Sequence, residues 1–131
     1  MKRSVLREHT FKLLFRSNFF AEEEMQEQGE LYTDTLENVK PEDAAAITGK
    51  VERILEKIPE IDRMIDEISV GWRVSRMGRV DLTILRLAVY EMKYDEDIPV
   101  AVAINEAVEL ARKYGGESSP SFVNGILAKL V

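Results

Sequence analysis

The sequence predicts an all-α fold, and three observations support this. The chain is rich in Leu, Ile, Ala, Glu, Lys and Arg, its prolines lie at segment boundaries, and no convincing alternation of apolar and polar residues indicates a β-strand. With 131 residues and 45% apolar content, the chain is long enough to bury a core. We therefore expect one compact helical domain, or two small helical subdomains that share a core.

The N-terminal half is predicted to contain a long first helix, an acidic connector and three further helices. The first helix runs from about Ser4 to Phe20, and Gly29 marks a break in the loop AEEEMQEQGE that follows. A short helix near residues 31–38 precedes Pro41, a residue favoured at the first position of a helix. The next helix covers EDAAAITGKVERILEKI and ends at Pro59, and IDRMIDEIS forms another.

The C-terminal half is predicted to be built around its most apolar element, residues 79–94. Apolar side chains cover well over half of this helix, which indicates a central helix buried by several neighbours. GWRVSRMG before it forms a turn and a brief helical piece. PVAVAINEAVELARKYGG is the next helix, and Gly115 and Gly116 end it in the left-handed conformation. Ser118, Ser119 and Pro120 start a last helix through Leu130. The narrow polar face of the central helix holds Arg79, Thr83, Arg86, Tyr90, Lys93 and Tyr94.

Charge is distributed unevenly along this acidic chain, whose formal net charge is -6. Residues 1–20 carry +4, residues 21–70 carry -10, residues 71–93 carry +3 and the remainder carries -3. Because salt screens surface charges over about 8 Å, a local basic patch can attract a polyanion that the whole molecule repels. Ordinary solvated faces are the alternative explanation.

The composition argues against several classes of function. There is no cysteine and one histidine, so disulfides, thiolate nucleophiles and zinc sites with Cys or several His are not expected. No nucleophile elbow or phosphate loop occurs, and Asp95 to Asp97 are more typical of a solvated turn than of a cation site. We expect no enzyme activity, metal or cofactor. No apolar run of about 18 residues and no signal peptide occur, which predicts a cytoplasmic protein that does not bind or span a membrane.

Nucleic-acid binding is better supported, because the first helix places cations and aromatic rings on one ridge. At about 100° per residue, Arg3, Arg7, Phe11 and Phe15 follow one another along it. A guanidinium group contacts phosphates in a forked geometry, and a ring beside it can stack on an unpaired base. This pattern is typical of a protein that binds single strands. The alternative is that Phe11 and Phe15 are core residues at the edge of the apolar stripe.

A second candidate surface lies at the start of the last helix. Ser118 and Ser119 offer hydroxyl groups for an anion, although capping their own helix is their more common use. Phe122 lies at the margin of the apolar stripe, so it is expected in the core first and as a contact second. Arg79 and Arg86 either pair with acids such as Glu106 or Glu109 or extend the basic surface, and their spacing leaves both open.

Three segments of the C-terminal half resemble the NusB family of bacterial transcription antitermination factors. They are GWRVSRMGRVDLTILRLAVYEM, DIPVAVAINEAVELARKYG and SFVNGIL, and KRSVLREHTFKLLF is similar to the family's Arg-rich first helix. The resemblance implies a NusB-like fold of about seven helices over residues 1–131, with subdomains of about 1–70 and 71–131. It also implies no enzymatic activity and binding of single-stranded boxA RNA from ribosomal RNA leaders. NusE, a small-subunit ribosomal protein, would be the partner, in an RNA polymerase elongation complex with NusA and NusG.

The resemblance also implies which residues contact RNA. Ser4, Val5 and Leu6 interrupt the family's run of arginines, which leaves fewer phosphate contacts and predicts weak binding without a partner. Some relatives have an acid at position 118, where this chain has serine. The RNA-binding residues implied by the resemblance are Lys2, Arg3, Arg7, Phe15, Asp81, Ser118 and Phe122, and Arg86 is added from its place on the basic face of the central helix.

Other functions stay open at this point. A NusB-like helical domain also occurs attached to ribosomal-RNA cytosine methyltransferases, but 131 residues leave no room for an α/β cofactor domain and no Gly-rich fingerprint follows a strand. A protein-interaction adaptor could use the basic ridge to contact an acidic partner, and a metal-dependent hydrolase at Asp95 to Asp97 is a remote third. Apolar helix faces also permit a homodimer.

Overall fold

A computed structural model describes all residues from 1 to 131, and it contains six α-helices and three short 3-10 helices. This confirms the all-α fold class, with a helix number close to the expected seven. The chain divides into two compact units, residues 1–56 and 57–131. The boundary lies inside a helix, and the expected boundary near residue 70 lies within the second unit.

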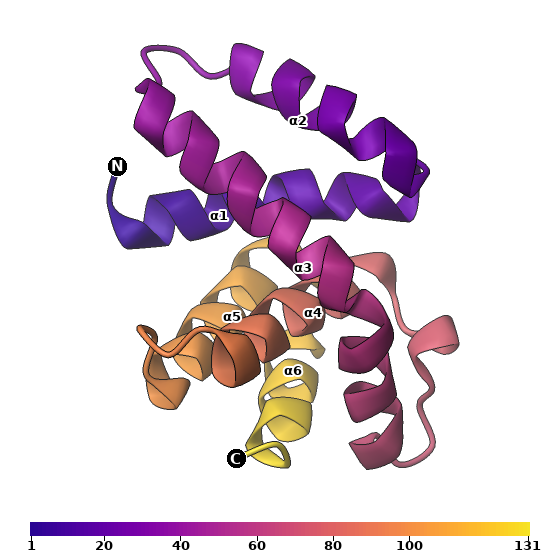
Figure 1. The fold of residues 1–131 in the computed structure, drawn as a ribbon. Coiled ribbons are helices and arrows are strands. Elements are labelled where there is room, and N and C mark those ends of the chain that lie inside the picture. The colour runs from indigo at the N-terminus through magenta and orange to yellow at the C-terminus, as the bar shows by residue number, and fades with distance from the viewer. The chain divides into compact units, whose positions relative to one another are not determined.

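The first unit is formed by α1 (Arg3–Phe15), α2 (Met25–Asp34) and the first part of α3 (Pro41–Ile68). Two 3-10 helices, η1 (Arg16–Asn18) and η2 (Glu22–Glu24), connect α1 to α2. α2 runs back along α1 in the opposite direction (Figure 1). The buried apolar side chains of this unit recur at helical spacing, and they are Phe11, Leu13, Leu14, Met25, Tyr32, Ile47, Val51 and Ile54.

Two expectations for the first unit are wrong. The first helix ends at Phe15 rather than near Phe20, and the segment expected as a loop is helical from Glu22 to Asp34. Gly29 does not break the chain but lies buried in α2, where a Cβ atom would come within 3.2 Å of the Thr48 side chain. A glycine at this position lets α2 approach α3 closely.

Pro59 does not end a helix, because α3 continues through it to Ile68. A proline inside a helix removes one backbone hydrogen bond and costs about 3 kcal/mol. Ile61 and Ile65 follow at helical spacing and are completely buried. Burial of two such side chains contributes about 1.5 to 3 kcal/mol each, which offsets the proline and keeps the helix continuous.

The second unit is formed by the rest of α3, η3 (Val74–Arg76), α4 (Arg79–Tyr94), α5 (Val100–Tyr114) and α6 (Ser119–Ala128). Each of α4, α5 and α6 packs against the other two (Figure 1). The prediction of a buried central helix over residues 79–94 is confirmed, with the same bounds.

The polar face of α4 is narrower than its sequence suggests. Thr83 and Tyr90 were expected on that face, but both are buried. The Thr83 hydroxyl donates a hydrogen bond to the backbone oxygen of Arg79 at 2.7 Å, so the side chain enters the core with its polar atom satisfied.

The end of α5 also differs from the expectation. Gly115 has a φ of -90°, and Gly71 is the glycine with a positive φ, so the predicted left-handed termination is wrong. Gly115 is required for space instead, because a Cβ atom there would lie 2.5 Å from the Ser119 hydroxyl. The backbone N–H of Gly115 donates to the oxygen of Ala111 at 2.9 Å and closes the last turn.

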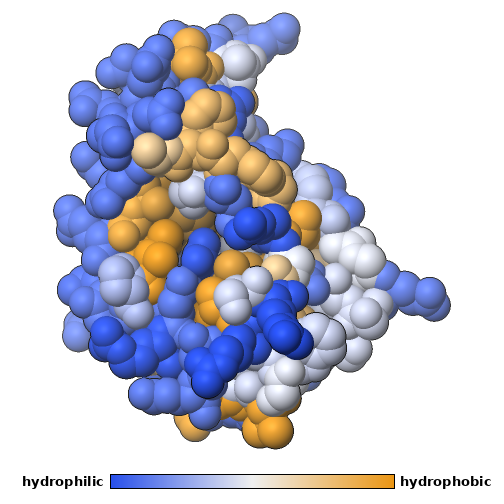
Figure 2. All heavy atoms as spheres, turned by 90° about the vertical axis from the view of Figure 1, so that its right-hand side faces the viewer, coloured by the Kyte–Doolittle hydropathy of each residue, from blue (hydrophilic) through white to orange (hydrophobic).

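Several large hydrophobic side chains remain on the surface, where they lie among hydrophilic ones (Figure 2). The most exposed are Phe19, Val70 and Trp72 within the chain and Val131 at its end. None of the helices combines the length and the apolar character that crossing a membrane requires.

Candidate nucleic-acid interface

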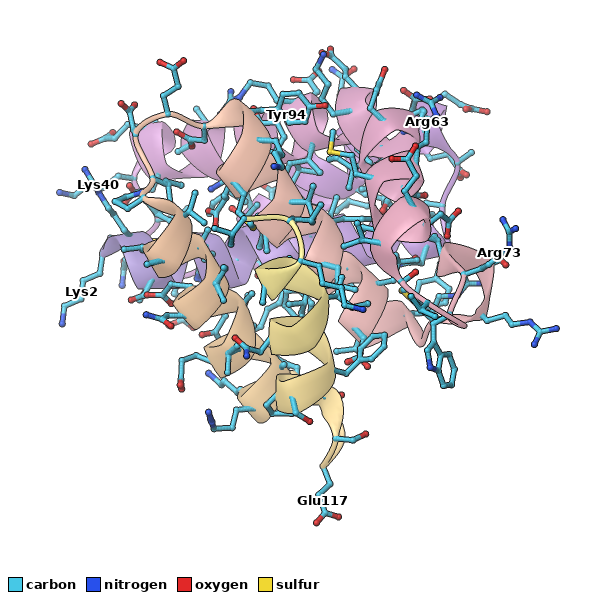
Figure 3. The ribbon with its side chains drawn as sticks, turned by 90° about the horizontal axis from the view of Figure 1, so that it is seen from below. Lys2, Lys40, Arg63, Arg73, Tyr94 and Glu117 are labelled. Atoms are coloured by element: carbon cyan, nitrogen blue, oxygen red, sulfur yellow. The ribbon has the colours of Figure 1, made fainter.

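Lys2 and Arg3 place two exposed cations at the start of α1. Neither makes an ion pair within the protein, and the Lys2 side chain extends away from the ribbon in Figure 3. The first turn of α1 contains no acidic residue. Free N–H groups and the helix dipole favour anions at this end of a helix, so both side chains and backbone are suited to a phosphate. The ammonium group of Met1 pairs with Asp43 at 3.1 Å and holds the chain start in place.

Arg7 does not continue this exposed surface. Its relative exposure is 6%, and it interacts within the protein. Phe11 is also buried in the core. The ridge expected to be exposed from Arg3 to Phe15 is therefore interrupted, because its central turn faces inward. In this structure Arg7 cannot offer its guanidinium to a strand in the way that Arg3 can.

Aromatic rings form a row at the end of α1. Phe15 is half-buried, and its ring centroid lies 6.3 Å from that of Phe11 and 5.3 Å from that of Phe19. Phe19 is 64% exposed. The row thus passes from the core to the solvent in steps of four residues. Phe19 is not among the residues predicted from the sequence, although its spacing of four from Phe15 is the signal that indicates it.

Polar and charged side chains of α1 and η1 hold these helices against α2. Arg16 donates a hydrogen bond to Gln28 at 3.0 Å, and its guanidinium lies 5.2 Å from the centroid of the Tyr32 ring. His9 Nδ1 and the Tyr32 hydroxyl are 2.7 Å apart. Burial lowers the pKa of His9 from its ordinary value of 6.5, Lys12 lowers it further, and Glu8 opposes the shift. These contacts join α1 to α2, so we assign them to the fold.

In the second unit, Arg86 forms an ion pair with an acidic residue. Its Nε and Nη2 atoms donate to the two carboxylate oxygens of Asp62 at 2.9 Å and 2.7 Å. The choice left open by the sequence is thereby decided in favour of pairing, with Asp62 in α3 rather than Glu106 or Glu109. This pairing is favourable because a forked guanidinium matches a carboxylate in two parallel hydrogen bonds.

The two serines at the start of α6 have different roles. Ser119 is buried, and its hydroxyl accepts a hydrogen bond from the backbone N–H of Gly116 at 2.9 Å. Ser118 is exposed, and no side-chain hydrogen bond caps the helix there. The Ser118 hydroxyl is therefore available to a ligand. Asp81, in the first turn of α4, is half-buried.

Phe122 is half-buried in α6, and its ring packs against the Trp72 ring in an edge-to-face arrangement, at a centroid distance of 6.2 Å. Trp72 is not among the contacts predicted from the sequence. Apart from Arg7 and Arg86, the expected residues fall into two sets, one in each unit, and Phe19 joins the first set. We call Lys2, Arg3, Phe15 and Phe19 the N-terminal surface, and Asp81, Ser118 and Phe122 the C-terminal surface.

The acidic turn before α5, residues 95–97, is the other candidate for a cation site. Asp95 instead accepts a hydrogen bond from the backbone N–H of Asp97 at 3.1 Å. No three of the chain's acidic residues and its histidine gather into a cluster suited to a metal ion.

Comparison with known proteins places the chain in a family. The model of the NusB family matches residues 4–131. The transcription antitermination protein NusB of Lachnoclostridium phytofermentans is 50% identical over 131 residues, which cover 100% of this chain and 99% of that protein. NusB of Agathobacter rectalis is 53% identical over 129 residues and 98% of each chain.

Solved structures agree with this placement. NusB of T. maritima has 33% sequence identity and a TM-score of 0.85, with 99% of this chain and 90% of that chain covered. A crystal structure of the antitermination factors NusB and NusE in complex with dsRNA contains the same fold, with a TM-score of 0.85, 24% identity and 98% and 94% coverage. The chain therefore belongs to the NusB family and is a transcription antitermination factor, not an enzyme.

Proposed function

We propose that the chain binds single-stranded boxA RNA of ribosomal RNA leaders as a heterodimer with NusE. In this function it joins an RNA polymerase elongation complex with NusA and NusG in the cytoplasm and supports processive transcription. The observation that carries the proposal is the N-terminal surface of this acidic protein, where two unpaired cations lie at the start of α1 and an aromatic row leads from the end of α1 to Phe19. The fold's occurrence in a complex of NusB, NusE and dsRNA supports the choice of partner.

Each residue of the N-terminal surface has a chemical role in this proposal. Lys2 and Arg3 contact phosphates, and the start of α1 adds backbone donors. Phe15 and Phe19 offer rings on which unpaired bases stack, a contact worth about 1 to 3 kcal/mol per base. Because stacking needs an unstacked base, this surface favours single-stranded RNA over a duplex.

The C-terminal surface contributes polar contacts beside a ring. The Ser118 hydroxyl can donate to a phosphate oxygen, and the Asp81 carboxylate can accept from a base amino group or a 2′-hydroxyl. Phe122 supplies a third ring. Arg7 and Arg86 are positioning residues in this proposal, because one is buried and the other is bound to Asp62.

Few phosphate contacts make the partner necessary. On single strands, each phosphate contact adds about -0.7 to the slope of log K against log salt concentration. Two exposed cations give a weak electrostatic contribution, so NusE supplies much of the affinity. The net charge of -6 limits indiscriminate binding to other polyanions. Self-association of the free chain also remains a prediction, and light scattering measures it.

A titration of fluorescently labelled boxA RNA with the heterodimer tests the proposal. We expect Lys2→Ala/Arg3→Ala and Phe15→Ala each to weaken boxA binding by about tenfold, while circular dichroism stays unchanged. Lys40→Ala/Arg53→Ala is the matched control, because it removes two cations of the same unit that lie outside the N-terminal surface. Equal affinity of the Lys2→Ala/Arg3→Ala variant and the wild type would remove the proposed surface. Equal binding of boxA and a scrambled strand would instead favour a protein-interaction adaptor.

A further inference from the structure

Trp72 is the chain's only tryptophan, and 54% of its surface is exposed. It lies in the segment between α3 and α4, next to an open hollow of about 440 Å³. Val70, two residues earlier, is 85% exposed. Large exposed apolar side chains that lie together commonly mark a site of contact with another molecule. The hollow is lined by Asp66, Ser69, Gly71, Trp72, Arg73 and Arg76.

Hydrogen bonds hold the turn that carries Trp72. Gly71 has a φ of +81°, which lets the chain reverse just before the ring. The Ser69 hydroxyl donates to the backbone oxygen of Trp72, and Asp66 accepts from the backbone N–H of Val74 at 2.7 Å. The ring is therefore presented by an ordered turn. A platform fixed before binding loses less conformational entropy when a ligand arrives.

Phe122 orients the Trp72 ring from one side. The two rings meet edge to face, at an interplanar angle of 76°. Because Phe122 belongs to the C-terminal surface, Trp72 extends that surface beyond α6. Trp72 remains 54% exposed beside Phe122, so part of the residue is accessible to a ligand.

The charges around Trp72 favour an anionic ligand. Arg73 and Arg76 are exposed and make no ion pair within the protein, and Arg73 extends away from the ribbon in Figure 3. Residues 69–79 contain three arginines and no acid. One oxygen of Asp66, the acid in the hollow, is already bonded to Val74. An exposed indole, followed in sequence by two arginines without ion pairs that line the same hollow, suits a nucleotide, whose base stacks while its phosphates pair.

We propose that Trp72 is a base-stacking site for single-stranded RNA, with Arg73 and Arg76 binding the phosphates on either side of the stacked nucleotide. This inference rests on the proposed function, since it assumes that the heterodimer binds RNA. It adds a nucleotide position to the C-terminal surface. An acidic protein segment is the competing ligand for the same two arginines, and the experiment distinguishes RNA from such a segment.

The fluorescence of Trp72 reports the contact directly. The heterodimer is titrated with boxA RNA while the anisotropy of a labelled strand follows binding. We expect the tryptophan emission to be quenched with the same midpoint as the anisotropy, because a stacked base quenches indole. The same titration with the heterodimer that carries Trp72→Phe measures any signal from tryptophans of the partner, because Trp72 is the only tryptophan of this chain. Duplex boxA RNA should leave Trp72 unquenched, since its bases are already stacked.

Substitutions then measure the contribution of each group. Trp72→Ala should weaken RNA binding by about tenfold, and Trp72→Phe should retain most of the affinity. Arg73→Gln/Arg76→Gln should make the slope of log K against log salt concentration shallower by about 0.7 for each phosphate that is no longer bound, whereas the charge-matched control Arg63→Gln/Arg112→Gln should not.

RNA binding with unchanged Trp72 emission would overturn the inference and leave the proposed function intact. Quenching by NusE alone, with no further change on RNA addition, would assign the patch to a protein partner. Absence of RNA binding would overturn both.

Discussion

The two units each contain an arginine that is withdrawn from solvent and others that are exposed. In the first unit Arg7 is buried while Arg3, one helical turn earlier, is open. In the second unit Arg86 is bound to Asp62, while Arg73 and Arg76 are open. The basic side chains of one segment therefore have two different roles. Some stabilise the fold, and others are available to a polyanion. The number of charges in the segment does not show which side chain has which role.

The aromatic residues show the same division. In the first unit, exposure rises from buried Phe11 through half-buried Phe15 to exposed Phe19. In the second unit, half-buried Phe122 leads to exposed Trp72. Each unit thus has a ring anchored in packed structure next to a ring that can stack on a base. The difference is that free arginines adjoin the exposed ring in sequence only in the second unit.

Replacement of Arg7 should give the largest effect on stability. Arg7→Ala removes a buried side chain and leaves its interaction partners unsatisfied, so we expect a loss of at least about 2 kcal/mol in the free energy of unfolding. Arg3→Ala, at an exposed position, should change it by less than about 0.5 kcal/mol. Urea denaturation measures both. Equal midpoints for the two variants would show that the contrast between the arginines is wrong.

The Arg86–Asp62 pair should give the next largest effect. Because the two hydrogen bonds involve charged groups and are partly shielded from solvent, we expect Arg86→Ala to cost about 1 to 3 kcal/mol. A double-mutant cycle with Asp62→Ala isolates the pairwise contribution. A coupling energy near zero would mean that the pair is an ordinary surface ion pair. Arg79→Ala, an exposed neighbour on the same helix, is the control.

The exposed cations should affect the salt dependence of binding rather than the stability. Lys2→Ala/Arg3→Ala should make the slope of log K against log salt shallower by about 0.7 for each phosphate that the variant no longer binds. Arg86→Ala should leave this slope unchanged if the folded state persists, because its guanidinium is occupied by Asp62. The measurement is a boxA titration of the heterodimer at several salt concentrations. A shallower slope for Arg86→Ala would return that residue to the RNA surface.

The smallest effect concerns His9 and pH. Its pKa is lowered in the folded protein, so the unfolded chain takes up the proton first, near 6.5. The stability that the neutral ring contributes is complete above this pH and falls as the pH drops toward the lowered pKa. His9→Gln should flatten the dependence of stability on pH in this window. Thermal unfolding between about pH 7.5 and 5.5 measures it, and parallel curves for the two proteins would show that another group is responsible.

The sequence predicts the second unit more closely than the first. The bounds of α4 match because apolar side chains cover most of that helix, and Gly78 and Asp95 flank it. The helix breaks predicted at Gly29 and Pro59 are wrong. In sequence, a glycine that allows two helices to pack closely looks the same as a glycine that ends a helix. A proline whose cost is offset by nearby burial likewise looks the same as a proline that ends one. Tertiary packing decides whether the helix continues at both positions, and the spacing of apolar residues within one helix gives no information about that packing.

The candidate site could be predicted in its residue types but not in its exposure. Lys2, Arg3 and Ser118 are open, as a contact requires. Arg7 lies on the same predicted ridge as Arg3 but is buried, because helical spacing fixes direction and not what packs there. Asp62, the partner of Arg86, comes from another helix 24 residues away, which no local pattern indicates.

Photochemical crosslinking tests the account most directly. BoxA RNA substituted with thiouridine is irradiated with the wild-type heterodimer, and the crosslinked peptides are mapped by mass spectrometry. We expect crosslinks in two places, at Phe15 and Phe19 and at Trp72 and Phe122. Crosslinks confined to α2 and α5, whose residues belong to neither surface, would contradict it.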